Sequence, residues 1–375
     1  MGGSLRGRDI RSIVVFKQRH IGDVLLSTPV FRALRASFPG ASTAAVVNEG
    51  TEEMLAGNPD IDRIVVFRRS RKAAGGMARG KEELSFLRKI RACRPDLAVQ
   101  LTEGDRGAIL SFLSGARFRL GVAPAKPGVF GKERLFTHLC PSPDRYRHAV
   151  LRDLDILENA GIPPADTSLR FFFSPGDRES LERKLHRAGV SGGMPYAIVH
   201  PTSRWKFKCW KDEGMAGIVT HLSRKGIFPV VTSGPDPTEV AQAERIAALS
   251  GAACASLAGS LTLKELGAAL APARLFVGVD SAPMHLAAAV ETPSVVLFGP
   301  TGAYNWAPWE GIDWGYTADR PSGTRHVGRH VVVQKEEDLL MKEKAKGRKN
   351  AGMEAITLAE VAEAVDRVLL TVAGR

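Results

Sequence analysis

Cysteine is scarce in this sequence, with four residues among 375 and no Cys-x-x-Cys pair. Their scattered spacing does not match the ligand patterns of zinc sites, and free thiols suit a reducing compartment. Long apolar runs are also missing, since none approaches the roughly 20 residues that span a bilayer. The run Ile13–Phe16 is too short for the apolar core of a signal peptide. We therefore expect a protein that stays in the cytosol.

Acidic residues are the other deficit. The chain has 40 Asp and Glu against 52 Lys and Arg, a formal net charge of +12 at pH 7. A basic surface favours polyanionic partners: nucleic acid, anionic lipid or a phosphorylated substrate. The excess is concentrated between Arg63 and Arg94, where eleven Lys or Arg stand against two acids. Within this stretch, residues 68–81 are punctuated by glycine and lack a periodic apolar pattern, which predicts a flexible basic loop.

Short apolar runs alternate with amphipathic stretches along the whole chain. The runs are bounded by Gly, Pro or Asp, as in the strands of a buried parallel sheet, and the alternation predicts an α/β fold. With 44% hydrophobic and 25% charged residues, the composition is that of a soluble globular protein. The predicted strands are Ile13–Phe16, Ala44–Val47, Ile64–Phe67, Leu97–Leu101, Tyr196–Val199, Pro229–Thr232, Leu275–Val279 and Ser294–Phe298.

The pattern weakens around residues 174–195, where a polar helix leads into a glycine-rich stretch and a new strand–helix series begins. We place a domain boundary near residues 186–195. The predicted architecture has two Rossmann-like doubly wound domains, 1–188 and 189–350, facing each other across a cleft. A helix within 354–373 is expected to pack back on the first domain. In the first domain, a helix is predicted over Val24–Phe38, with Pro29 bending its first turns.

The first candidate site is the turn after the first strand, KQRHIGDVLLSTP, residues 17–29. Ligands of α/β sheets bind at the carboxyl ends of strands, where this turn lies. Asp23 stands at the predicted helix start, where it is either an N-cap or a carboxylate that takes a proton from a hydroxyl. Gly22 allows a tight turn or close approach of a substrate. No GxGxxG motif follows this strand, and its absence argues against a hydride-transferring oxidoreductase.

The second candidate site is HPTSRWKFKCW, residues 200–210, which follows the strand at Tyr196. It combines the hydroxyls of Thr202 and Ser203 with three cations, Lys208 among them. Hydroxyl donors and fixed cations are what a diphosphate requires. The alternative is a solvated basic loop.

The third candidate site is DSAPMHLAAA, residues 280–289, directly after a predicted strand. A small-residue turn at Ser281–Ala282 opens an alanine-rich helix, whose N-terminus forms an anion site. In the alternative interpretation, Asp280 only caps the helix and His285 is only a core histidine.

Two carboxylates, Asp153 and Asp155, resemble the DxD motif of metal-dependent transferases. They lie inside a helical pattern, residues 147–160, where positions i and i+2 point about 200° apart. The two carboxylates therefore do not share an ion, and we interpret both as helix surface.

In this order, KQRHIGDVLLSTP, HPTSRWKFKCW, TSGPD and FVGVDSAPMHLAAA resemble the successive motifs of the lipopolysaccharide heptosyltransferases, glycosyltransferase family 9. The resemblance implies the GT-B fold and inverting transfer from ADP-L-glycero-D-manno-heptose, with no metal and no cofactor. It implies that Asp23 is the general base. The residues that it implies for the donor are Thr202, Ser203 and Lys208 on the diphosphate, Asp236 on the ribose, and Asp280, Ser281, Ala282 and His285 around the donor heptose and phosphate.

The pair Arg19-His20 and the Lys-Cys-Trp spacing at residues 208–210 are similar to the heptosyltransferase III subgroup, which adds a branch heptose to an inner-core heptose. We expect the protein to act on a lipid-linked core acceptor at the cytoplasmic face of the inner membrane. Anionic lipid is expected to help hold the protein at this surface. The expected acceptor-side residues are Lys17, Arg19, His20, Gly22, Arg68, Arg69, Arg71 and Lys72. Another sugar or acceptor within the family is one alternative. A nucleic-acid-binding protein is another, but no recognition-helix or stacking-sheet signature supports it. A third alternative is a nucleotide-binding regulator without catalysis, which the intact Asp23 argues against.

Overall fold

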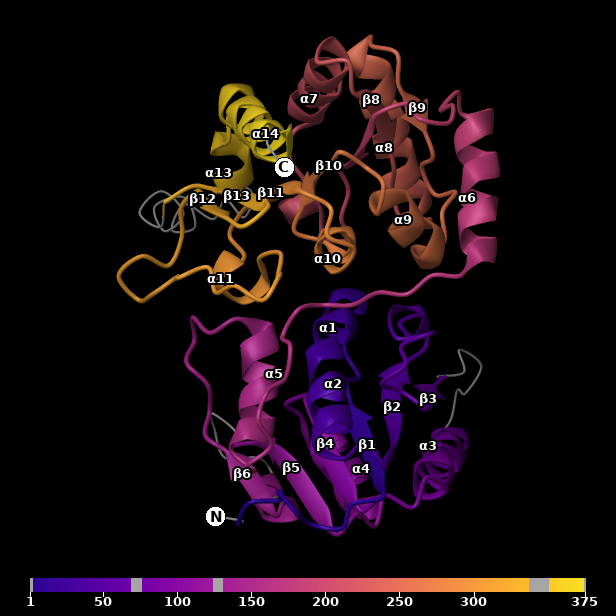
Figure 1. Ribbon diagram of the computed structural model, residues 1–375, viewed down its shortest axis with the longest axis vertical. Coiled ribbons are helices and arrows are strands. Elements are labelled where there is room, and N and C mark those ends of the chain that lie inside the picture. Colours follow the sequence, from indigo (N-terminus) through magenta and orange to yellow (C-terminus); the bar gives the residue numbers. More distant parts are fainter. Residues whose placement is uncertain (1–2, 69–75, 124–130, 337–350, 374–375) are drawn as a thin grey trace. The chain divides into compact units, whose positions relative to one another are not determined.

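A computed structural model describes residues 3–68, 76–123, 131–336 and 351–373 of the chain. The chain divides into two compact units, Met1–Phe172 and Phe173–Arg375. Each unit is built on one predominantly parallel sheet (Figure 1). Among the described helices, none has both the length and the apolar character needed to cross a bilayer.

The first unit has a six-stranded parallel sheet in the order β3-β2-β1-β4-β5-β6. This is the strand order of a doubly wound nucleotide-binding fold. The strands are β1 Ser12–Phe16, β2 Ser42–Asn48, β3 Arg63–Phe67, β4 Leu97–Gln100, β5 Phe118–Val122 and β6 His138–Cys140. The helices are α1 Ile21–Leu26, α2 Thr28–Ser37, α3 Gly76–Arg91, α4 Asp105–Leu113 and α5 Ala149–Glu158, with 3-10 turns η1 Glu52–Met54 and η2 Lys132–Leu135.

Helices cover both faces of this sheet. Phe86 and Ile90 of α3 and Leu110 of α4 pack in one apolar cluster with Val14 and Val46 of the sheet. Helices α1, α2 and α5 pack against one another on the other face (Figure 1). Because both faces of the central strands are buried, β1 and β4 are apolar along most of their length, as their sequences indicated.

The second unit has a seven-stranded sheet in the order β12-β13-β11-β10-β7-β8-β9, in which only β12 runs antiparallel to its neighbour. The strands are β7 Tyr196–His200, β8 Phe228–Val231, β9 Ala255–Ser256, β10 Leu275–Val279, β11 Ser294–Phe298, β12 Arg325–Val327 and β13 His330–Gln334. The helices are α6 Pro175–Arg187, α7 Asp212–Arg224, α8 Pro237–Ser250, α9 Leu263–Leu270, α10 Ala282–Ala289, α11 Ala303–Trp306, α13 Ala351–Ala355 and α14 Leu358–Ala373, with the 3-10 turn η3 Lys206–Lys208.

The predicted strands are confirmed within two residues at each end. The helix predicted over Val24–Phe38 is instead two helices that meet at Ser27. Pro29 lies in the first turn of α2, where a backbone N–H has no partner within the helix, so the missing N–H of proline breaks no hydrogen bond. Pro29 therefore marks the start of α2 and does not bend a longer helix. The predicted basic loop 68–81 was partly wrong, because α3 already begins at Gly76.

The predicted boundary near residues 186–195 was too late. Helix α6 belongs to the second unit, where Leu181 and Leu185 are buried and Lys184 lies 2.7 Å from Glu265 of α9. The polar sequence of α6 concealed this, because only a narrow stripe of the helix is apolar.

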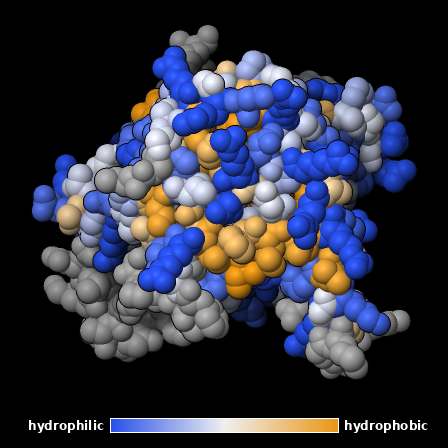
Figure 2. All heavy atoms as spheres, turned by 90° about the horizontal axis from the view of Figure 1, so that it is seen from below, coloured by the Kyte–Doolittle hydropathy of each residue, from blue (hydrophilic) through white to orange (hydrophobic). Residues whose placement is uncertain are grey.

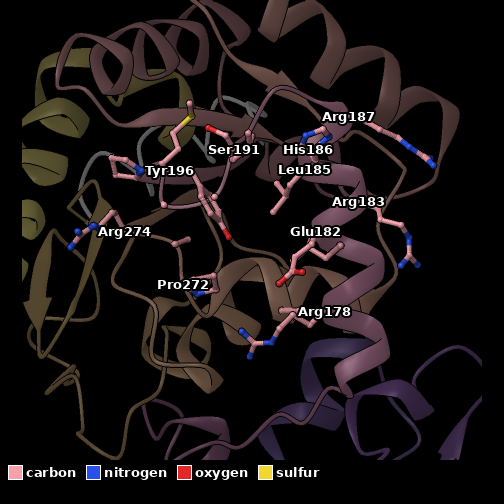
Figure 3. A pocket seen from close by; sticks show the side chains of 18 of the residues that line it. Arg178, Glu182, Arg183, Leu185, His186, Arg187, Ser191, Tyr196, Pro272 and Arg274 are labelled. Atoms are coloured by element: carbon pink, nitrogen blue, oxygen red, sulfur yellow. The ribbon is translucent and has the colours of Figure 1, made fainter.

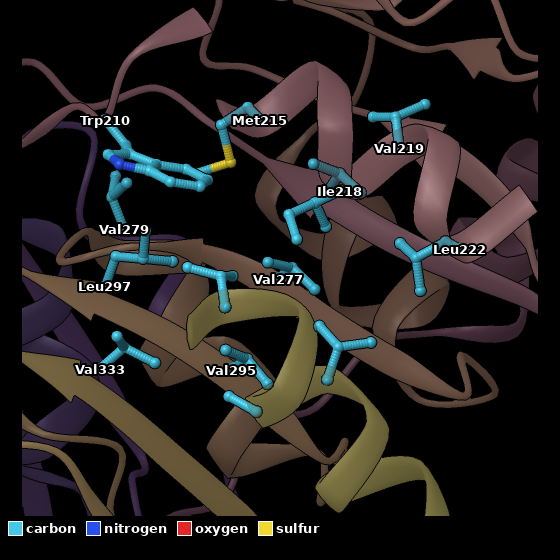
Figure 4. Packing of buried hydrophobic residues seen from close by; sticks show 14 of the residues in the cluster. Trp210, Met215, Ile218, Val219, Leu222, Val277, Val279, Val295, Leu297 and Val333 are labelled. Carbon is cyan, nitrogen blue, oxygen red and sulfur yellow. The ribbon is translucent and has the colours of Figure 1, made fainter. Parts of the chain in front are cut away.

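The C-terminal helix was also placed wrongly. Helix α14 belongs to the second unit, where it packs on α7, β10, β11 and β13. Its buried Val361, Val365 and Val368 share one core with Trp210 and the central strands (Figure 4). The Trp210 indole N–H donates to the Ile356 carbonyl oxygen at 3.1 Å, just before α14 begins.

A buried ion pair joins the end of β1 to α5. The Lys17 ammonium lies 2.5 Å from the Asp153 carboxylate, and the two side chains are 6% and 7% exposed. Burial raises the pKa of Asp153 to about 6, Lys17 opposes that shift, and the negative charge of Asp23 adds to it. The interpretation of Asp153 as helix surface was therefore wrong. Asp155 points elsewhere and pairs with Arg147, so the two carboxylates are indeed separate.

Removing one partner of this pair should destabilise the first unit strongly. We expect Lys17→Met or Asp153→Leu alone to cost about 3–5 kcal/mol, because each leaves an uncompensated buried charge, whereas the double variant should be nearly neutral. Urea unfolding of the two single variants and the double variant measures this coupling. Costs that simply add in the double variant would contradict the pairing.

Candidate functional site

Asp23 lies in the first turn of α1, at the carboxyl edge of the first sheet. The N-cap position is taken by His20, whose backbone is extended, so the alternative interpretation of Asp23 as the N-cap was wrong. The Asp23 side chain is partly exposed and has no hydrogen bond or ion pair with any residue that the structure describes. It is available to accept a proton.

The residues expected on the acceptor side do not share one environment. Arg19 and His20 are exposed, and Gly22 is the second residue of α1. Lys17, expected on the acceptor side, is instead buried and bound to Asp153. The Arg68 side chain is 73% exposed and lies 3.8 Å from the Glu49 carboxylate, and Arg69, Arg71 and Lys72 lie outside the described residues.

In the second unit, the register of two neighbouring strands brings a lysine to an aspartate. Strands β7 and β10 are parallel, with His200 opposite Gly278, so the loops that leave them run side by side. A Cβ atom on Gly278 would come within 3.0 Å of the His200 carbonyl oxygen. The Lys208 ammonium lies 2.7 Å from the Asp280 carboxylate, with side chains 20% and 6% exposed. Lys208 therefore holds a positive charge at this edge and is still accessible.

Helix α10 begins directly beside this pair. Ser281 occupies its N-cap position, but the hydroxyl donates to the Val279 carbonyl oxygen at 3.2 Å and does not cap the helix. Its N-terminus is therefore a ready position for an anion, with the dipole adding to the charge of Lys208. Ala282 and Pro283 open the helix, and His285 is buried in the following turn.

A second carboxylate enters this site from α8. The buried Thr202 hydroxyl donates to the Glu239 carboxylate at 2.8 Å, and Ser203 is buried next to it in the chain. Asp236, expected on the ribose, is the N-cap of α8 and accepts from the Thr238 amide at 2.8 Å. The hydrogen bonds from Thr238 lower the pKa of Asp236.

Glu239 was missed by the sequence interpretation, although a signal was present. An Asp followed three residues later by a Glu is typical of a helix start, with the first residue as the cap. That spacing assigns Asp236 to capping and places Glu239 in the first turn of the helix.

The remaining charge of this edge is positive. Burial lowers the pKa of His200 to about 4, so this histidine is neutral at physiological pH, and its ring bonds the Thr232 hydroxyl at 3.0 Å. The cations are Lys208 and the exposed Arg204 and Lys206. In the part of the chain that the structure describes, no three His, Cys, Asp or Glu side chains are grouped to hold a metal ion.

A hollow of about 970 Å³ lies elsewhere on the second unit, between α6, residues 191–195 and the starts of β7 and β10 (Figure 3). Arg178 and Glu182 point from α6 toward it, and the Tyr196 hydroxyl donates to the Ala269 carbonyl oxygen at 2.7 Å. It adjoins the amino ends of the strands, whereas Lys208 and Asp280 lie at their carboxyl ends. We assign it no part in the site.

Comparison with known proteins identifies the family of the chain. Residues 83–324 match the model of glycosyltransferase family 9 (heptosyltransferase). Lipopolysaccharide heptosyltransferase 3 of Escherichia coli K12 is 34% identical over 294 residues, which cover 78% of this chain and 83% of the relative. Lipopolysaccharide heptosyltransferase 1 of Pseudomonas aeruginosa is 27% identical over 299 residues, covering 78% and 81%.

Solved structures show the same fold. A glycosyl transferase family 9 protein of Veillonella parvula matches with a TM-score of 0.79 at 21% identity, covering 96% of this chain and 97% of that one. The E. coli heptosyltransferase WaaC with ADP-2-deoxy-2-fluoro heptose matches with a TM-score of 0.69 at 18% identity, covering 95% and 99%. The chain therefore belongs to glycosyltransferase family 9, the heptosyltransferases, with the two-domain GT-B fold, and its similarity to heptosyltransferase 3 supports the heptosyltransferase III subgroup.

Proposed function

We propose that the protein transfers heptose from ADP-L-glycero-D-manno-heptose to an inner-core heptose of lipopolysaccharide, with inversion and without a metal. The observation that carries the proposal is the 34% identity to a lipopolysaccharide heptosyltransferase 3 over most of both chains. The ADP-heptose analogue named with the WaaC structure supports the donor. The Lys208–Asp280 pair beside α10 supports the chemistry, because it holds a cation where a diphosphate is expected.

Asp23 is the proposed general base. Inversion requires a single displacement, in which the acceptor oxygen attacks the anomeric carbon while the bond from that carbon to the ADP oxygen breaks. The proton of the acceptor hydroxyl passes to the Asp23 carboxylate. This carboxylate suits the role, because it is partly exposed and no described residue occupies its oxygens.

The second unit is proposed to stabilise the leaving ADP. As the bond breaks, negative charge grows on the diphosphate, so a fixed cation and free N–H groups stabilise the transition state more than the ground state. Lys208 supplies the cation and the start of α10 supplies the N–H groups. Thr202 and Ser203 are the proposed hydroxyl donors. We transfer the ribose contact from Asp236 to Glu239, which already accepts a hydrogen bond within the site.

We also propose that the protein works at the cytoplasmic face of the inner membrane, where its acceptor is anchored. The described part of the basic stretch supports this, because Lys81, Arg88, Lys89 and Arg91 of α3 are all exposed. Each cation near an anionic bilayer contributes about 1 kcal/mol, screened over about 8–10 Å at physiological salt.

Replacing the base should abolish transfer without affecting the donor site. We expect Asp23→Asn to lower kcat by about 10²- to 10⁴-fold, the usual contribution of a general base, with unchanged ADP affinity by calorimetry. Asp177→Asn, in the first turn of α6, is the matched control and should keep full activity. Wild-type kcat in Asp23→Asn would remove this residue from the mechanism.

Removing the cation should weaken ADP binding and lower kcat together. A charge-assisted hydrogen bond contributes about 1.5–3 kcal/mol, so Lys208→Ala should weaken ADP binding about 10- to 150-fold. Lys206→Ala, an exposed cation of the same 3-10 turn, is the control. Because the substitution leaves Asp280 unpaired, Lys208→Ala/Asp280→Asn is measured beside it. Unchanged ADP affinity and turnover in both would place Lys208 outside the site.

Transfer should require ADP-heptose and no divalent metal. We expect the same turnover on a truncated core acceptor with and without EDTA, because Lys208 and the α10 N-terminus supply the charge that a metal would bring. A panel of other nucleotide sugars, each tested with the same acceptors, checks the donor. Activity that EDTA removes and Mg²⁺ or Mn²⁺ restores would contradict the metal-free mechanism, and preference for another donor would contradict the heptose assignment.

A further inference from the structure

Exposed apolar side chains of the first unit gather on two neighbouring helices. The large hydrophobic side chains of this unit that are exposed in the described residues are Leu84 of α3 and Ile109, Phe112 and Leu113 of α4, between 42% and 48% exposed. The last three follow the spacing i, i+3, i+4, so they share one side of α4, whereas Leu110 faces the core. Figure 2, which views the molecule from below, shows where hydrophobic (orange) and hydrophilic (blue) residues lie on that side.

An ion pair connects these two helices. Arg106 of α4 donates to both carboxylate oxygens of Glu83 of α3 at 3.0 Å, and both helices pack on the same face of the sheet. We call this surface, defined by Leu84, Ile109, Phe112 and Leu113, the α3–α4 face.

Cations border the α3–α4 face on both sides. On α3, exposed Lys81, Arg88 and Arg91 lie three or four residues from Leu84 or from each other, so they share its stripe of the helix. On the other side, the Arg119 guanidinium lies 5.4 Å from the centre of the Phe112 ring. Arg117 is exposed two residues before Arg119, and the exposed Arg134 belongs to η2, which packs against α4. The two acids of α3, Glu82 and Glu83, are one or two positions from Leu84, so they lie on other sides of the helix, and Glu83 is bound to Arg106.

We infer that the α3–α4 face inserts into the surface of an anionic bilayer, with the three apolar residues of α4 entering between the headgroups and the cations binding lipid phosphates. Helices with an apolar side and a basic border bind membranes in this way, with the apolar side about 5–10 Å deep. A second copy of the chain fits less well, because a two-fold interface places the same surface on both partners and would bring these cations together. The inference rests on the proposed membrane location and names the surface that makes the contact.

The test compares apolar and charged variants on vesicles. We expect the wild-type protein to bind phosphatidylglycerol-containing vesicles at least tenfold more tightly than pure phosphatidylcholine vesicles. The variant Ile109→Ser/Phe112→Ser/Leu113→Ser should lose at least tenfold in this binding. The matched control, Leu249→Ser/Ile312→Ser/Leu370→Ser, removes three exposed apolar side chains of the second unit and should bind like wild type. The charge variant Lys81→Glu/Arg88→Glu/Arg91→Glu should also lose binding, and its residual binding should depend little on salt.

Further measurements separate this inference from the proposed function. Transfer to a lipid-free core acceptor should be unchanged in the α4 variant, and its thermal midpoint should match wild type. A folded α4 variant that binds vesicles as wild type does would overturn insertion, even if the charge variant fails to bind. A wild-type dimer that becomes a monomer in the α4 variant would overturn it as well, since the face would then belong to a second copy. Absence of transfer to any acceptor, with vesicle binding intact, would count against the proposed function alone.

Discussion

Parallel pairing of buried central strands is the constraint on which both candidate sites depend. In a parallel sheet all carboxyl ends lie at one edge, so the loops that follow separate strands meet there. Strand β10 lies between β7 and β11 and is buried along its whole length. Its register against β7 fixes where the loops that follow the two strands begin. The residue after β10 is Asp280, the loop after β7 carries Lys208, and the two side chains form an ion pair. A slip of one residue in this register would turn the buried side chains to the opposite face of the sheet.

The lysine–aspartate pairs Lys17–Asp153 and Lys208–Asp280 differ in how far their lysines are exposed. Lys17 and Asp153 are both nearly inaccessible, so neither exchanges its partner for a ligand, and the pair acts as a fixed link between β1 and α5. Lys208 is more exposed than Asp280, so an incoming anion can reach it. In the first unit, Lys17 is bound to Asp153 and therefore does not pair with Asp23. Among the described residues no lysine is bound to the Asp23 carboxylate, which suits its proposed role as general base.

The first unit presents two separate surfaces. Asp23 lies at the carboxyl edge of its sheet, whereas the α3–α4 face covers one side of the same sheet. Contact with a membrane through α4 therefore does not compete with an acceptor hydroxyl for the surface around Asp23. Much of the exposed side of helix α3 consists of Lys and Arg side chains. These side chains account for part of the excess of positive charge found between residues 63 and 94 of the sequence.

Local patterns in the sequence determined the α/β class, eight of the strands, the family and the loops that carry Thr202, Lys208 and Asp280. These features depend on residues that are close in the chain, where period, composition and turn chemistry act directly. Tertiary structure alone decided the partners of each charge. Asp153 was assigned to the surface because helical spacing shows which residues share a side but not which side is buried. Helices α6 and α14 were misplaced for the same reason, because the sides that they bury depend on partners far away in the chain, such as Glu265 for Lys184 of α6. For Glu239 the spacing from Asp236 indicated the helix start, but only the tertiary structure brought its carboxylate to Thr202.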